Sequence, residues 1–167
     1  PVKGKGGKKT GAGGPWVVVE NSPSLDPTQK ALAVEAWVKA DKPNGVVVAR
    51  GGPAQGYAII LQAGQPQFVI RAATKISSGG AKEKVTGKWV HLAGVLTKDA
   101  TLKLFVDGKL AATAKGTGLI TSDPVQTTEI GADEEGSVGD YPMTFPLTGT
   151  VDEVRVYFGN VTDAEIA

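Results

Sequence analysis

The sequence contains no cysteine, and His91 is the only histidine among its 167 residues. A disulfide framework and thiolate metal sites are therefore excluded. A zinc site is not expected either, because zinc takes most of its ligands from several histidines and cysteines. The lack of cysteine does not fix the cellular compartment, since a chain of this length buries enough surface to fold without disulfides.

Long apolar runs are also missing. No stretch of about eighteen apolar residues exists, and the first residues lack the apolar region of a signal peptide. We therefore expect no membrane insertion. Two catalytic or nucleotide-binding motifs are absent as well: there is no G-x-S-x-G elbow, and "GKGGKKTG" lacks the spacing of a phosphate-binding loop.

The first segment of the chain differs from the rest in charge. Residues 1–14, "PVKGKGGKKTGAGG", carry four lysines and no large apolar side chain except Val2. We predict a basic, glycine-rich tail or linker over 1–14 and one domain over 15–167. Without those four lysines, 14 of the 18 basic residues remain against 17 acidic ones, a net charge of −3. The basic segment is compatible with nucleic acid or an anionic surface, but a solvated linker needs no partner, and we expect no nucleic-acid ligand.

Glycine and proline are abundant, at 23 and 10 residues, and they separate short segments of branched and aromatic side chains. Such spacing is typical of strands joined by turns. Ten segments show the pattern: 15–20, 32–40, 45–51, 56–63, 66–73, 88–96, 101–108, 109–114, 127–132 and 149–158. This succession predicts an all-β fold, an antiparallel sandwich of two sheets.

Alternation of side chains supports strands over helices. In "LAVEAWVKA" the valines share one face, and Glu35, Trp37 and Lys39 share the other. We nevertheless expect Trp37 and Trp89 to be core residues, although a shift of one register step would exchange the faces.

Two further local signals concern the chain geometry. Asp107-Gly108 supplies the positive φ angles of a type I′ turn and predicts a two-residue hairpin. Thr162 and Glu165 form a T-x-x-E capping box, which predicts at most a short helical turn at the C-terminal end.

His91 lies in the segment "GKWVHLAGV" and is the obvious candidate for a catalytic base. On a strand over 88–96, it shares one face with Trp89 and Ala93, and the opposite face is also largely apolar. No second histidine or fixed nucleophile accompanies it, as general-base or nucleophilic catalysis would require. We therefore expect His91 to be structural.

Acidic residues gather in "ADEEGSVGD", which contains Asp133, Glu134, Glu135 and Asp140. Two carboxylates about 5 to 10 Å apart would suit glycoside hydrolysis. The run lies in a glycine-bearing segment rather than on alternating strand positions, so we expect a solvated loop. Oxygen-rich loops also suit calcium, for which the candidate ligands are this loop, Glu20, Asn21, Asp152 and Glu153.

Several separated stretches together resemble a known family. They are "NSPSLDPTQKALAVEAWVKA", "VVVARGGPAQGYAIILQAGQPQFVI", "GKWVHLAGVLTKDATLKLFVDGKLAAT", "EIGADEEG" and "LTGTVDEVRVYFGNVTDAEI". Over residues 16–167 the chain resembles the laminin-G-like jelly-roll domains of the concanavalin A-like lectin and glucanase superfamily. The most specific parts are "KWVHLAGV", "LFVDGKL" and "GTVDEVRVY" in that order.

The resemblance implies a jelly-roll sandwich that serves mainly as a non-catalytic binding module of secreted or cell-surface proteins. The strand that carries His91 belongs to the scaffold in such domains. A structural calcium ion is implied, with Asp152 as the matching ligand and Glu20 proposed from its place in the chain. The E-x-D-x-x-E motif of the catalytic branch is absent, so we do not expect an enzyme.

We predict that the domain recognises a glycan or a neighbouring protein domain, in an extracellular, periplasmic or cell-surface setting. Sugar binding combines an aromatic face with hydrogen bonds from loop side chains, and the candidate ligand-binding residues are Tyr57, Asp140 and Tyr141. Two alternatives remain open. In the first, the domain is a structural spacer packed on a catalytic domain of a longer chain. In the second, it is a glycosidase or lyase that uses the acidic residues between 133 and 140.

Overall fold

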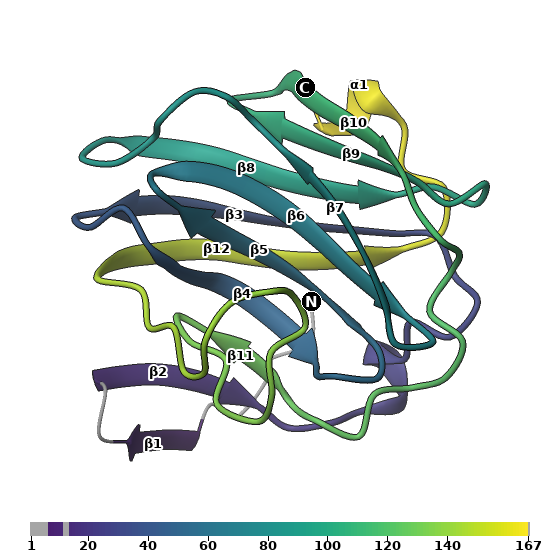
Figure 1. Ribbon diagram of the computed structural model, residues 1–167, viewed down its shortest axis with the longest axis horizontal. Coiled ribbons are helices and arrows are strands. Elements are labelled where there is room, and N and C mark those ends of the chain that lie inside the picture. The colour runs from purple at the N-terminus through teal and green to yellow at the C-terminus, as the bar shows by residue number, and fades with distance from the viewer. Residues whose placement is uncertain (1–6, 12–13, 167) are drawn as a thin grey trace.

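The computed structural model describes residues 7–11 and 14–166, which form a sandwich of two β-sheets (Figure 1). The strands are β1 (Gly7–Gly11), β2 (Gly14–Val19), β3 (Leu32–Ala40), β4 (Gly45–Gly51), β5 (Gly56–Gln62), β6 (Gln65–Ala72), β7 (Lys75–Gly80), β8 (Trp89–Leu96), β9 (Thr101–Val106), β10 (Lys109–Lys115), β11 (Thr128–Ile130) and β12 (Gly149–Phe158). The helical elements are a 3-10 turn, η1 (Pro23–Leu25), and a short helix, α1 (Asp163–Ile166).

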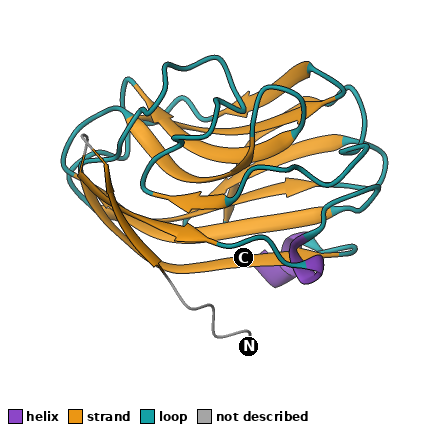
Figure 2. Cartoon of the chain, turned by 90° about the horizontal axis from the view of Figure 1, so that it is seen from below, coloured by secondary structure: helices purple, strands orange, loops and turns teal. Residues whose placement is uncertain are grey.

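One sheet has seven strands in the order β1-β2-β11-β4-β5-β6-β7, and the other has five in the order β10-β9-β8-β3-β12. Neighbouring strands within each sheet run antiparallel. Figure 2 shows the two layers from the side, with long loops at the rims. The predicted all-β jelly-roll sandwich with a short C-terminal helical turn is confirmed.

All ten predicted strands are present, and their bounds differ from the expected ones by no more than two residues. The prediction missed β7, "KISSGG", because only one of its side chains is large and apolar. It also missed β1, which pairs with β2 inside the segment predicted to be a tail. Part of the predicted tail therefore forms a strand, and the domain boundary at residue 14 stays a prediction; residues 1–6 and 12–13 lie outside the described residues.

Alternate residues of each strand form the core between the sheets. On β3, Leu32, Val34 and Val38 are fully buried there, and on β8 Val90 and Leu92 are. A period of two sends their sequence neighbours to the outer face. The faces predicted for these two strands are confirmed.

Both edges of the five-stranded sheet are irregular. The register of β10 against β9 shifts between Leu110 and Ala112. The register of β12 against β3 shifts between Asp152 and Arg155. Such bulges leave a residue unpaired and bend the strand.

The predicted hairpin and helix cap are both present. Asp107 and Gly108 have φ angles of 48° and 73°, as a type I′ turn between β9 and β10 requires. At α1, the Glu165 carboxylate accepts hydrogen bonds from the Thr162 amide at 2.8 Å and from its hydroxyl at 2.7 Å. The capping box therefore fixes the start of the helix.

Each sheet has an outer face that the chain covers in part. The loop 131–147 packs on the seven-stranded sheet through Val138 and Tyr141. On the five-stranded sheet, Val161 and Ile166 cover a cluster formed by Ala33, Ala93, Val95 and Phe105. The rest of that second face is open. In the described residues, no helix has the length and apolar character needed to cross a membrane.

Candidate functional site

The three residues predicted to bind a ligand lie in different environments. Tyr57 lies near the start of β5, as the predicted strand over 56–63 requires, and its side chain is fully buried in the core. The pleat of the strand turns Tyr57 inward, so its ring is not accessible to a ligand. Tyr141 lies in the expected loop but is buried too, whereas Asp140 is exposed. Neither tyrosine offers a ring to a ligand.

Tyr141 and Asp133 anchor the loop instead. The Tyr141 hydroxyl donates to Asp133 Oδ2 at 2.5 Å, and the Val138 amide donates to the same oxygen at 3.2 Å. Burial raises the pKa of Asp133 to about 6 and also raises the pKa of Tyr141. Asp133 is thus an internal anchor, not the solvated loop residue that was expected. Glu134 and Glu135 are exposed.

Asp140 borders a small hollow on the outer face of the seven-stranded sheet. The hollow has a volume of about 240 Å³ and is lined by Ile60, Gln62, Gln67, Val69, Ile76, Ser78 and Asp140. Its floor is aliphatic and its rim is polar. An aromatic face for a sugar is missing from this lining.

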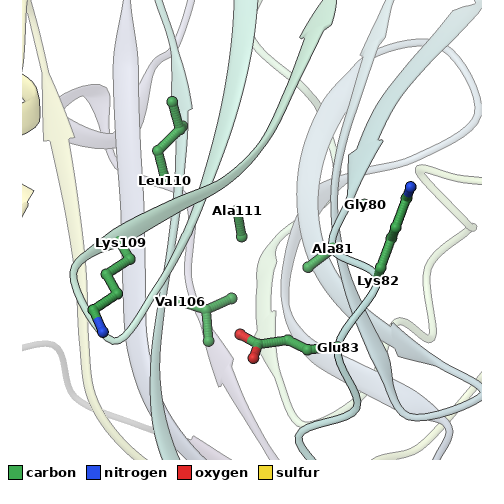
Figure 3. A pocket seen from close by; sticks show the side chains of 8 residues that line it. All are labelled: Gly80, Ala81, Lys82, Glu83, Val106, Lys109, Leu110 and Ala111. Atoms are coloured by element: carbon green, nitrogen blue, oxygen red, sulfur yellow. The ribbon is translucent and has the colours of Figure 1, made fainter.

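A larger hollow of about 370 Å³ opens between the two sheets, where the end of β7 approaches the β9–β10 hairpin (Figure 3). The Glu83 carboxylate points into it, over Val106, while the amino groups of Lys82 and Lys109 point away. Each of the two hollows is lined by a single carboxylate, Glu83 or Asp140. Glycoside hydrolysis uses a facing pair, which neither hollow provides.

The outer face of the five-stranded sheet carries two exposed tryptophans. Trp37 on β3 is 41% exposed and Trp89 on β8 is 46% exposed. The prediction that both are core residues is therefore wrong. Trp37 opposes His91 in the register, and Lys39 opposes Trp89, so the two indoles are diagonal neighbours on adjacent strands.

His91 completes this surface. Its ring centroid lies 5.5 Å from that of Trp37, at an interplanar angle of 47°. Its Nε2 lies 3.2 Å from Glu35 Oε2. We call Trp37, Trp89 and His91 the tryptophan platform.

Glu35 lies beside the platform, two residues before Trp37 on the same face of β3. It is only 8% exposed, and its Oε1 accepts hydrogen bonds from Tyr157 Oη at 3.0 Å and from Arg155 Nη1 at 3.3 Å. Partial burial and the Glu35 carboxylate raise the pKa of the Tyr157 phenol. With His91 Nε2 as a third polar neighbour, the buried carboxylate is contacted by the side chains of Arg155, Tyr157 and His91, which fixes the positions of these side chains.

The arrangement can hold a ligand that has an apolar face and polar edges. Indole rings offer a flat apolar surface with a hydrogen-bonding N–H, and the neighbours of the platform are charged or polar. The sequence did contain the signal for Trp37, which alternates with Glu35 and Lys39 on the solvent side of its strand. His91 contacts Glu35 and Trp37 as part of the scaffold of this surface, and its structural role stays a prediction.

The two residues predicted to bind calcium belong to different sheets. Asp152 lies on β12 of the five-stranded sheet, and its Oδ1 accepts the amide hydrogen of Glu153 at 2.8 Å. Glu20 follows β2 of the seven-stranded sheet and is exposed. Over 7–11 and 14–166, no three acidic or histidine side chains gather as metal ligands would. Calcium binding through Asp152 and Glu20 stays a prediction.

Comparisons with solved structures show the same fold. The binding domain of botulinum neurotoxin serotype G is similar with a TM-score of 0.71 and 10% identity, over 95% of this chain and 40% of that chain. The botulinum neurotoxin DC binding domain in complex with rat synaptotagmin II gives a TM-score of 0.69 and 11% identity, over 98% of this chain and 44% of that chain. A native heptameric SAP-like pentraxin from Limulus polyphemus gives 0.61 and 14%, over 84% of this chain and 72% of that chain.

The chain spans about 40% of the length of the toxin domains, and identities this low show the fold alone. No curated protein matches the chain. Residues 11–167 match the family model of the concanavalin A-like lectin/glucanases superfamily, in its laminin-G-like form. The chain belongs to this family.

Proposed function

We propose that the domain is a non-catalytic glycan-binding module and that its ligand stacks on the tryptophan platform. One observation carries the proposal: Trp37 and Trp89 lie exposed as diagonal neighbours on a sheet face whose other exposed side chains are mostly polar. A pyranose ring has the complementary form, with an apolar C–H face and hydroxyl groups at its edge. Stacking on an indole and hydrogen bonds to the rim satisfy both parts.

The expected energy is sufficient for specific binding. If a ligand covers about 100 Å² of each indole, burial contributes about 2 to 3 kcal/mol per tryptophan at about 25 cal/mol/Å². Loss of one ring is then expected to weaken binding by about 30- to 150-fold. The platform is also preorganised, because Trp37 already packs against His91 and His91 is contacted by Glu35, so less ordering entropy is lost on binding.

A glycan array and titration calorimetry test the proposal. We expect Trp37→Ala and Trp89→Ala each to lose binding while keeping the thermal midpoint close to that of the unsubstituted protein, since both side chains are exposed. Ile76→Ala is the matched control, because Ile76 is also 41% exposed but lies on the other sheet beside Asp140. Binding that depends on Ile76 or Asp140 and not on the tryptophans would contradict the proposal.

A protein partner is the second candidate. Tryptophan, tyrosine and arginine are enriched at the centres of protein interfaces, and Trp37, Tyr157 and Arg155 share this face. One similar structure is a binding domain in complex with synaptotagmin II. Failure of every glycan to bind, together with capture of a defined neighbouring domain through Trp37, would favour this candidate or the spacer hypothesis.

The family resemblance also supports a place outside the cytoplasm, as an accessory domain of a larger exported protein. Fractionation of the native host into cytoplasmic, surface and secreted material, followed by detection of the domain, tests this location. Recovery in the cytoplasmic fraction alone would contradict it.

A further inference from the structure

We propose that the ligand of the domain is a linear glycan chain of several sugar units, which lies across the tryptophan platform toward Tyr157, rather than a single sugar. The inference rests on the proposed function and names the ligand class of the same site. It follows from the positions of the exposed aromatic side chains on the outer face of the five-stranded sheet.

All three exposed aromatic side chains in the described part of the chain lie on this face. Tyr157 on β12 is 41% exposed, as is Trp37 on β3, and Trp89 on β8 is 46% exposed. The strands β12, β3 and β8 are neighbours in the sheet. We call Tyr157, Trp37 and Trp89 the aromatic track.

The strand register places the track along one diagonal of the sheet. Tyr157 opposes Ala33, four residues before Trp37 on β3, so Tyr157 and Trp37 are about 14 Å apart along the strand direction. Trp37 opposes His91, two residues after Trp89 on β8, so the backbones of the two tryptophans are about 7 to 8 Å apart. Both steps run in the same direction. The whole track therefore covers about 20 Å along the strands, several times the width of one pyranose ring.

Polar side chains occupy the interval between Tyr157 and Trp37. Glu35 and Arg155 oppose each other there, and Arg155 Nη1 donates to Glu35 Oε1 at 3.3 Å. The Arg155 side chain is half exposed, so it lies where it can meet the hydroxyl groups of a sugar between the two rings. A linear glycan has apolar ring faces and hydroxyl edges along its whole length, and it therefore matches this succession of aromatic and polar groups.

The track is open rather than recessed. None of its three residues lines either of the two hollows described above. Small ligands bind in concave sites that bury most of their surface, whereas an open sheet face covers only one side of a sugar. Because the binding energy grows with the apolar area that is covered, such a face needs several sugar units in a row.

Oligosaccharides of increasing length test the inference. Cello-, malto- and laminari-oligosaccharides of one to six units are titrated by calorimetry, together with size-graded fractions of any glycan that binds on the array. In the series that binds, we expect the hexasaccharide to bind about 10-fold or more tightly than the disaccharide. Trp37→Ala should weaken the binding of both. A longer chain also offers more binding registers, so the decisive quantity is the part of the gain that depends on Tyr157.

Variants at Tyr157 separate the track from the platform. Tyr157→Ala is expected to weaken hexasaccharide binding by about 10-fold and to change disaccharide binding by less than about 2-fold, because only the longer ligand reaches Tyr157. Tyr157→Phe removes the hydroxyl that donates to Glu35 but keeps the ring, and it should bind both ligands as the unsubstituted protein does. Leu110→Ala is the matched control, because Leu110 is 51% exposed on β10, at the edge of the same sheet opposite to β12, and it should change neither.

The results that overturn the inference can be told apart from failure of the proposed function. Trp37-dependent binding of a monosaccharide as tight as that of the hexasaccharide refutes the chain ligand and leaves glycan binding at the platform intact. A gain with length that survives Tyr157→Ala, or that Tyr157→Phe or Leu110→Ala removes, refutes the track in the same way. Absence of Trp37-dependent binding to every oligosaccharide and to the glycan array refutes the proposed function, and the inference with it.

Discussion

The ring of Phe68 on the seven-stranded sheet lies against Gly94 on the five-stranded sheet. A Cβ added to Gly94 would stand 2.2 Å from Phe68 Cδ2. Phe68 is fully buried, so the ring fills the space that any side chain at residue 94 would need. This contact sets the separation of the two sheets at the centre of the core.

We therefore expect Gly94→Ala to destabilise the protein by about 1 to 3 kcal/mol, because an overpacked core forces neighbours from their preferred rotamers. The thermal midpoint should fall by about 2 to 12 °C for a chain of this size. Gly79→Ala is the matched control, since its Cβ would make an ordinary contact of 3.6 Å with Ala114. Equal midpoints for the two variants would show that the core relaxes around residue 94.

The buried carboxyl of Asp133 makes stability depend on pH. Its folded-state pKa of about 6 lies above its unfolded value of 3.8, so the folded state binds the proton more tightly. The resulting stabilisation is complete below about pH 4 and is lost as the pH rises through about 6. It amounts to about 3 kcal/mol.

Asp133→Asn removes this titration and keeps an oxygen acceptor for Tyr141 and the Val138 amide. We expect the stability of the variant relative to the unsubstituted protein to rise between pH 4 and pH 7. Denaturant unfolding at half-unit pH steps measures the difference. A difference that stays constant over this range would contradict the raised pKa of Asp133.

The fully buried Arg50 is expected to make the stability of the protein depend on Asp123, its ion-pair partner in the segment 116–127. Its Nη2 lies 2.7 Å from Asp123 Oδ1, and its Nη1 donates to Asn21 Oδ1 at 2.8 Å. Asp123→Ala leaves the buried charge with one strong partner and should cost about 1 to 3 kcal/mol, since Asp123 is itself partly exposed.

The double variant Arg50→Met/Asp123→Ala checks the cause. Replacing Arg50 as well as Asp123 should recover part of the lost free energy of unfolding, because an apolar side chain of similar length needs no counter-charge. Urea unfolding of the single and double variants gives the coupling. Additive losses would show that Asp123 contributes through loop packing rather than through Arg50.

Ile166 ties the C-terminal helix to the outer face of the five-stranded sheet. Its side chain is buried against Ala93 and Phe105 among others. Ile166→Ala should release α1 at a cost of about 2 kcal/mol, near the lower end for a buried isoleucine, because a helix of four residues held by one buried side chain can rearrange. Hydrogen exchange is expected to accelerate at Glu165 and to stay unchanged in β5; faster exchange in both would indicate global destabilisation instead.

Strand positions and inner faces could be predicted from the sequence, because a period of two is a local property. In β3 the alternation of apolar and charged residues was sufficient to place Glu35 and Lys39 on the outer face of the sheet. For β7 the segment "KISSGG" has one large apolar residue, and its pairing with β6 is set by the tertiary fold.

The exposure of an outer face could not be predicted, because it depends on distant segments. Val95 and Trp89 share one face of β8, yet Ile166 covers the cluster that includes Val95, and Trp89 remains exposed. No feature of the sequence around Val95 and Trp89 predicts which of the two side chains is covered. Tyr57 was proposed as a ligand-binding residue because it lies at the start of its strand, next to a loop, but the side chain packs in the core between the sheets.

The bulges on β10 and β12 have a consequence for behaviour at high concentration. Unpaired, straight strand edges recruit further strands and lead to ordered aggregates, whereas a bent edge with lysines resists such addition. Both borders of the five-stranded sheet are bent, and Lys109 and Lys115 stand at the two ends of β10. The domain is therefore expected to stay free of edge-to-edge association through this sheet even at high protein concentration.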